Sequence, residues 1–142
     1  MIYTLKIKCV WGIYLQEPFE RTVEIESATT LDEMHEVMQS LTNFDNDHCY
    51  DFFTGKTPRD IRNSLGQDGG FSTASKKLKK IKLADVFPLP PGHYLFYWFD
   101  FGDDWKFQIS LKKESEKQAG TKYPRVIAKK GPQPIQYPEI EE

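Results

Sequence analysis

The chain has 142 residues, close to the commonest size of a single domain, and two halves would each be too small for a proper core. Its 19 lysines and arginines nearly balance 21 aspartates and glutamates, which excludes an overall basic field for gripping nucleic acid. Two distant cysteines, Cys9 and Cys49, exclude a disulfide framework and a thiolate zinc site, and no apolar run matches a secretory signal or a membrane span. We therefore expect a cytoplasmic protein with reduced thiols and no membrane partner.

Two segments of alternating hydrophobicity at the start of the chain predict neighbouring antiparallel strands. The first covers residues 2–11 and the second residues 19–26, and the link between them is short. The pattern predicts that one face of the first strand carries Tyr3, Leu5, Ile7, Cys9 and Trp11.

A helix is predicted after the second strand. Thr30 and Glu33 form a T-x-x-E capping box, and apolar residues recur at helical spacing from Leu31 to Leu41. Asn43 is a suitable end point. The apolar stripe predicts a face buried in the core.

A short third strand is predicted at Tyr50 to Phe53, and residues 55–75 are predicted to form a surface loop with a short helical turn near 60–65. The next predicted elements are two aromatic-rich strands, at residues 93–101 and from Trp105 to Lys112, joined by a tight turn that contains Gly102. Burial of each ring stabilises a fold by roughly 1.5–3 kcal/mol, which predicts that this hairpin is the largest apolar contributor.

These elements predict a single α+β domain over residues 1–130, followed by an extended, partly disordered tail at 131–142. The fold is expected to be a strongly curved antiparallel or mixed sheet with one main helix packed on it, in the order β-β-α-β and then the aromatic hairpin, with a last strand from residue 123 to 128. A β-grasp-like arrangement of the first hairpin and helix is the alternative within this class.

Candidate binding residues are gathered near the helix and the aromatic hairpin: His35, His48, Asp100, Asp103 and Trp105. A metal site for Zn, Mn or Fe would use the two histidines with Asp100 or Asp103 and would suit a hydrolase-like enzyme. We favour a structural interpretation, in which His35 is hydrogen-bonded at the edge of the core and the aspartates hold the turn. No catalytic residue, cofactor or metal is therefore predicted.

Five closely spaced lysines are the candidate nucleic-acid contacts: Lys76, Lys77, Lys79, Lys80 and Lys82. Phe71 or Phe87 would be available to stack on bases. Lysines on the solvent side of an edge strand also prevent aggregation, and we favour this second interpretation.

The segment from Tyr97 to Trp105 resembles the Y-x-Y-D-F-G-D-x-W signature of the plasmid pRiA4b ORF-3-like family. Weaker matches lie at residues 19–23, 31–39, 48–52 and 123–125. The chain departs from the family pattern in three places: Phe99 replaces a tyrosine, Phe107 stands where the family often has a histidine, and residues 131–138 replace an acidic C-terminal segment.

The resemblance implies an association with plasmids and mobile elements but no assigned activity. We predict a non-enzymatic binding or interaction module. The sequence does not identify its partner: a protein is one candidate, and nucleic acid is a second candidate with weaker support. Two alternatives stay open: a nucleic-acid accessory protein that uses Lys76 to Lys82, and a metal-dependent hydrolase-like enzyme.

Overall fold

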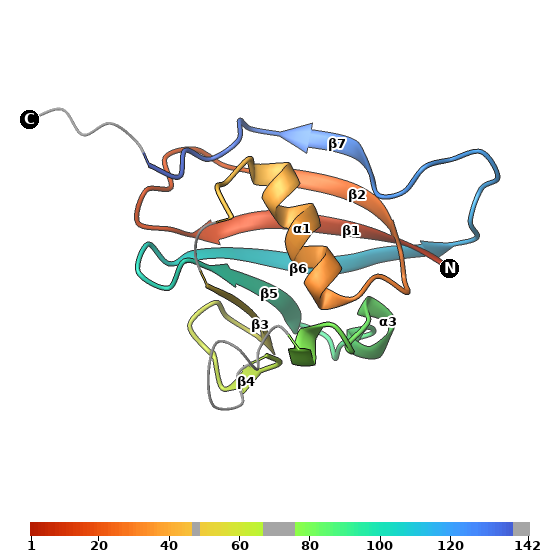
Figure 1. Cartoon of the computed structure of the whole chain (residues 1–142), viewed down its shortest axis with the longest axis horizontal. Helices are drawn as coiled ribbons and strands as arrows, with labels where there is room; N and C mark the ends of the chain where they lie inside the picture. The colour runs from red at the N-terminus through yellow and green to blue at the C-terminus, as the bar shows by residue number, and fades with distance from the viewer. Residues whose placement is uncertain (47–48, 67–75, 138–142) are drawn as a thin grey trace, which may run out of the picture.

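The structure is a computed structural model that describes residues 1–46, 49–66 and 76–137. Seven strands form one sheet in the order β4-β3-β5-β6-β1-β2-β7, and helix α1 lies across one face of it (Figure 1). All the strand pairs of this sheet are antiparallel. The predicted α+β class and the antiparallel sheet are confirmed, and the described strands do not form a mixed sheet.

The elements follow the chain as β1 (Ile2–Trp11), β2 (Glu20–Glu26), α1 (Leu31–Thr42), β3 (Tyr50–Gly55), β4 (Asn63–Ser64), α3 (Leu83–Val86), β5 (Tyr94–Phe99), β6 (Trp105–Ser115) and β7 (Arg125–Lys130). The predicted first hairpin and aromatic hairpin are confirmed. The helical turn predicted near 60–65 is wrong, because β4 lies there and pairs with β3.

Helix α1 begins and ends as its sequence predicts. The Thr30 hydroxyl accepts a hydrogen bond from the backbone N–H of Glu33 at 3.2 Å, and the Glu33 carboxylate accepts one from the Thr30 N–H at 3.0 Å. Asn43 ends the helix in the left-handed region, with φ of 58°. Leu31, Met34 and Met38 are fully buried, so the predicted apolar stripe packs on the sheet.

The aromatic hairpin forms the centre of the sheet and of the core. β5 lies between β3 and β6, and the rings of Tyr97, Phe99 and Phe107 are fully buried on the α1 side. Phe44, which follows α1, packs 4.9 Å from Trp105, measured between ring centroids. Helix and hairpin therefore share one apolar core.

Trp11 departs from the predicted pattern. The register between β1 and β6 shifts between Cys9 and Trp11, as in a β-bulge, so Trp11 pairs with Lys106 rather than continuing the buried face. Its side chain is 49% exposed. The prediction that Trp11 lies on the core face with Cys9 is wrong, because a single inserted residue reverses the alternation.

Strand β7 is held at the edge of the sheet by β2 and by a buried arginine. Arg21 is 5% exposed, and its guanidinium donates hydrogen bonds to the carbonyl oxygens of Lys130 at 3.2 Å and Gly131 at 2.9 Å. The chain then returns towards the end of α1, where the Gln136 side chain accepts from the Asp45 N–H at 2.6 Å. Of the predicted tail, residues 138–142 lie outside the described residues.

Across the described ranges, no helix is long and apolar enough to span a bilayer.

The capping box generates a stability prediction. Thr30→Ala removes the hydroxyl that accepts from the Glu33 N–H, and we expect the free energy of unfolding to fall by about 1 kcal/mol in urea titrations. Thr29→Ala is the matched control, since the Thr29 side chain makes no hydrogen bond in the described structure. Equal losses in both variants would contradict a specific contribution from the cap.

Candidate functional site

His35 lies between α1 and the sheet, and it is 2% exposed. Its Nδ1 is 2.6 Å from the Tyr97 hydroxyl, and its Nε2 is 2.8 Å from the Asn46 side-chain oxygen. The ring stacks on Tyr50 with a centroid separation of 3.5 Å and an angle of 3°. Three elements, α1, β3 and β5, therefore hold this imidazole.

The hydrogen bonds around His35 assign its protons. The Asn46 oxygen only accepts, so Nε2 carries the proton and Nδ1 accepts from the Tyr97 hydroxyl, which itself accepts from Gln39 Nε2 at 2.9 Å. Burial lowers the pKa of His35 and raises the pKa of Tyr97 well above its usual value. The result is a neutral, fully hydrogen-bonded pair, and a metal ion could bind His35 only by displacing Asn46 or Tyr97.

Asp100 and Asp103 belong to the turn between β5 and β6. The Asp100 carboxylate accepts from the Asp103 N–H at 3.2 Å, and its own N–H donates to the Cys49 carbonyl at 2.9 Å. Asp100 and Asp104 adopt φ of 57° and 59°, so two aspartates, rather than Gly102, occupy the left-handed positions of this turn. The Asp103 carbonyl accepts from Ile13 N–H at 3.1 Å and ties the turn to the end of β1.

Of the remaining predicted binding residues, the structure describes Trp105, which belongs to the core rather than to a surface. Trp105 is fully buried, and its ring is so close to Gly12 that a Cβ there would lie 2.6 Å from it. His48 lies outside the described residues. Within the ranges that the structure does describe, no group of three or more His, Cys, Asp or Glu side chains is placed to hold a metal ion.

The five lysines from Lys76 to Lys82 are all exposed, but they do not lie on an edge strand. The segment makes a helical turn and then a single bridge between Lys82 and Thr30, while Leu78 is buried beneath it. The edge-strand interpretation is therefore wrong. Phe87 is 5% exposed and packs edge-on against Tyr3, so it is not available to stack on a base, and Phe71 lies outside the described residues.

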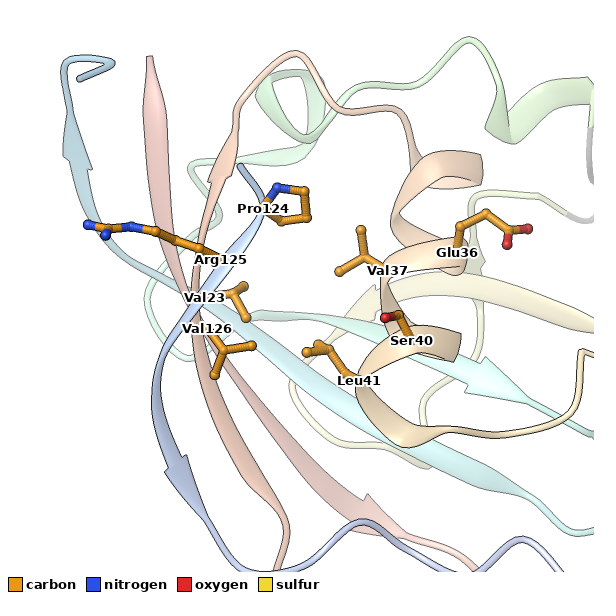
Figure 2. A pocket seen from close by; sticks show the side chains of 8 residues that line it. All are labelled: Val23, Glu36, Val37, Ser40, Leu41, Pro124, Arg125 and Val126. Atoms are coloured by element: carbon orange, nitrogen blue, oxygen red, sulfur yellow. The ribbon is translucent and has the colours of Figure 1, made fainter. Parts of the chain in front are cut away.

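A groove between α1 and β7 is a feature that the sequence interpretation missed. Figure 2 shows Val37 and Leu41 on α1 pointing across to Val126 and Pro124, with Val23 of β2 between them. The cavity measures about 310 Å³. A second cavity of about 330 Å³ continues it and shares Val37 and Pro124.

The rim of this groove carries an excess of negative charge. Glu33 and Glu36 are exposed on α1 along its rim. Arg125 also lines the groove, but its guanidinium points away from α1 (Figure 2) and pairs with Glu24. The groove therefore combines aliphatic walls with an acidic rim.

The sequence of β7 contains a feature from which the groove could have been suspected. Its residues include two adjacent aliphatic side chains, Val126 and Ile127, which are 38% and 48% exposed. Exposed aliphatic residues on an edge strand are unusual unless they contact something. The pairing of β7 with β2, more than 90 residues earlier, cannot be derived from local patterns.

Comparisons with known proteins identify the family of the chain. A family model described as plasmid pRiA4b ORF-3-like protein matches residues 2–137. The chain belongs to this family. A search of curated proteins finds no significant match for this pRiA4b ORF-3-like chain.

A solved structure shows the same fold. The crystal structure of a protein of unknown function, MM3350, from Methanosarcina mazei Go1 superposes with a TM-score of 0.69 at 23% sequence identity. The alignment covers 90% of the pRiA4b ORF-3-like chain and 68% of that protein. The comparison supports the fold and assigns no activity.

The buried His35 of this pRiA4b ORF-3-like protein generates a pH prediction. Because burial lowers its folded-state pKa, His35 stabilises the fold fully above the unfolded value of 6.5, and this contribution is lost as the pH falls below it. We expect the free energy of unfolding to fall by up to about 1.4 kcal/mol per pH unit below that value.

The measurement is urea unfolding between about pH 8 and pH 5.5, a range that brackets the usual histidine pKa. His35→Gln is the reference, since it keeps the other titrating groups and removes this one. The prediction is contradicted if both proteins lose stability with the same slope.

The turn generates a ranking of variants at Asp100. Asp100→Ala loses the acceptor for Asp103 and places a Cβ without a polar partner at φ of 57°, and we expect a loss of about 1–2 kcal/mol in the free energy of unfolding. Asp100→Gly tolerates this φ and should cost less, while Asp100→Asn keeps both features and should cost least. An unchanged melting curve for Asp100→Ala would show that the carboxylate does not hold the turn.

Proposed function

We propose that this protein is a non-enzymatic interaction module that binds an extended segment of a partner protein in the groove between α1 and β7. The observation that carries the proposal is the aliphatic wall on each side. Val37 and Leu41 face Val126 and Pro124 in an open groove (Figure 2), where water now covers apolar surface that a partner would bury.

The dimensions suit an extended segment. The groove follows α1 from Glu33 to Leu41, which is about 12 Å at 1.5 Å per residue. At about 3.3 Å per residue, roughly four residues of an extended chain span this length. Alternate side chains of such a segment would enter the groove while the others remain at the rim.

The negative charge at the rim of the groove favours a basic partner segment. Glu33 and Glu36 favour lysine or arginine on the partner, because the guanidinium of Arg125 is turned away towards Glu24. The C-terminal residues of the chain itself include Glu139, Glu141 and Glu142, which would repel this rim. We therefore propose a separate partner whose segment alternates aliphatic and basic side chains.

We propose that this interaction module serves as an accessory protein of a mobile element, a role with which binding of a partner protein is compatible. The hydrolase-like alternative has less support, because both ring nitrogens of His35 are hydrogen-bonded. The alternative based on Lys76 to Lys82 retains its exposed charge, but the buried Phe87 supplies no stacking surface.

The test uses fluorescently labelled peptides of about eight residues, twice the span of the groove. A peptide of alternating valine and lysine should bind, measured by fluorescence polarisation. Peptides of valine and glutamate, or of serine and lysine, should bind more weakly because they lack the charge or the aliphatic side chains.

Variants locate the binding. Val126→Ser removes one wall and should weaken binding about fivefold, while Ile127→Ser, a neighbouring exposed aliphatic residue outside the groove, should not. Glu36→Lys should shift the preference towards the valine–glutamate peptide. Equal effects of Val126→Ser and Ile127→Ser, or a valine–lysine peptide that binds no better than the other two, would contradict the proposal.

A further inference from the structure

The face of the sheet opposite α1 is open over strands β6, β1, β2 and β7. Cross-strand partners on this face include Lys8 with Gln108 and Lys6 with Ser110. Lys8 is exposed and the other three are partly exposed, whereas the alternate residues of β1, such as Leu5 and Ile7, are fully buried under α1. No described element therefore covers this part of the sheet.

An aromatic and basic cluster lies at one end of this face. Lys106 is paired across the strands with Trp11 on one side and Trp98 on the other. Its Nζ lies 5.0 Å from the Trp98 ring centroid and 3.4 Å from the Asp104 carboxylate. Trp11, Pro58 and Arg59 complete a cavity of about 310 Å³ with Asp104 and Lys106.

Trp11 is the accessible ring of this cluster. Its side chain is 49% exposed, and it reaches this face only because of the β-bulge after Cys9. An indole of this exposure offers a flat surface for stacking, and Arg59 supplies a cation at the same cavity, whereas Lys106 is 8% exposed and paired with Asp104.

The open face carries an excess of positive charge although the whole chain has a formal net charge of −2. The acidic side chains on or beside it are in ion pairs: Glu20 with Lys6, Glu24 with Arg125, Glu26 with Lys117 and Asp104 with Lys106. Four cations on or beside it have no acidic partner in the described structure: Lys8, Arg59, Lys112 and Lys130.

These cations extend away from Trp11. Lys8 lies on β1 between the cavity at Trp11 and a second cavity of about 420 Å³ that is lined by Lys112 and Lys130. The separation of Trp11 from Lys6 along β1 is about 16 Å at 3.3 Å per residue. A ligand that contacts the whole face must therefore be extended and carry repeated negative charge.

We propose that this open face binds single-stranded nucleic acid, with one base stacked on Trp11 and the backbone phosphates near Arg59, Lys8, Lys112 and Lys130. A single strand combines exposed bases with a regular series of phosphates, whereas duplex bases are already stacked on each other. This site is on the opposite face from the groove and does not depend on the proposed peptide binding.

The test is fluorescence anisotropy with a labelled oligothymidine of about 12 nucleotides, a length within the range that single-strand-binding folds cover. Binding should weaken with rising salt and should quench tryptophan fluorescence. Trp11→Ala should weaken binding about tenfold and remove most of the quenching, while Trp11→Phe, which keeps a stacking ring, should weaken it less. Tyr137→Ala, which removes another half-exposed aromatic ring, should have no effect.

Charge reversals separate this site from the other lysines. Lys8→Glu should weaken binding severalfold and reduce its salt dependence, whereas Lys79→Glu should not. Circular dichroism and thermal melting of each variant establish that it is folded. The proposal is overturned by the absence of binding, by folded Trp11→Ala that binds as tightly as the wild type, or by a loss confined to Lys79→Glu. Equal affinity for duplex DNA or for polyglutamate would overturn it as well, because either would reveal a surface that attracts any polyanion.

Discussion

The pairing of β6 with both β5 and β1 is the interaction on which the rest of the structure depends. β6 extends from Trp105 to Ser115, and it joins the aromatic hairpin to the first hairpin along one continuous sheet. Without β6 the sheet would be divided in two, and α1 would pack on only one of the halves. β5 directly precedes β6, but β1 comes from the beginning of the chain. The entropy of closing a loop of nearly the whole domain must therefore be offset by the burial of Phe107, Ile109 and their neighbours.

The two faces of this sheet have different environments because one helix covers only part of the area. α1 packs over the centre, where His35 and Gln39 supply polar groups that satisfy the Tyr97 hydroxyl. Beyond α1, the sheet continues to β7, and the difference in width leaves the groove (Figures 1 and 2). On the other face, Phe53 of β3 and Phe96 of β5 are fully buried, but the strands beyond β6 stay open. Both candidate surfaces therefore result from incomplete coverage of one sheet rather than from an additional structural element.

Much of this architecture is encoded locally and was accessible from the sequence. The alternation in β1 and β2, the capping box at Thr30 and the aromatic hairpin each depend on neighbours within a few residues. The features that failed depend on distant pairing. The bulge after Cys9 is a property of two strands in contact, and no pattern within β1 marks it. The interpretation of Lys76 to Lys82 as an edge strand failed because buried Leu78 and the bridge to Thr30 determine the path of that segment. The candidate site was harder still: the sequence named His35 and Trp105 as candidate binding residues while favouring a structural role for His35, and both side chains are buried in the core here.

Arg21 attaches β7, which forms one wall of the groove, through the backbone of that strand rather than through its side chains. Its guanidinium holds the last residues of β7 through carbonyl oxygens, so it constrains where that strand lies but not which side chains the strand displays. All six side chains of β7 are exposed, and none of them fills the interior. Mutations there can change what the wall recognises at little cost in folding free energy. The residues that stabilise the fold are thus separate from β7, a strand whose side chains can be replaced to give a different binding specificity.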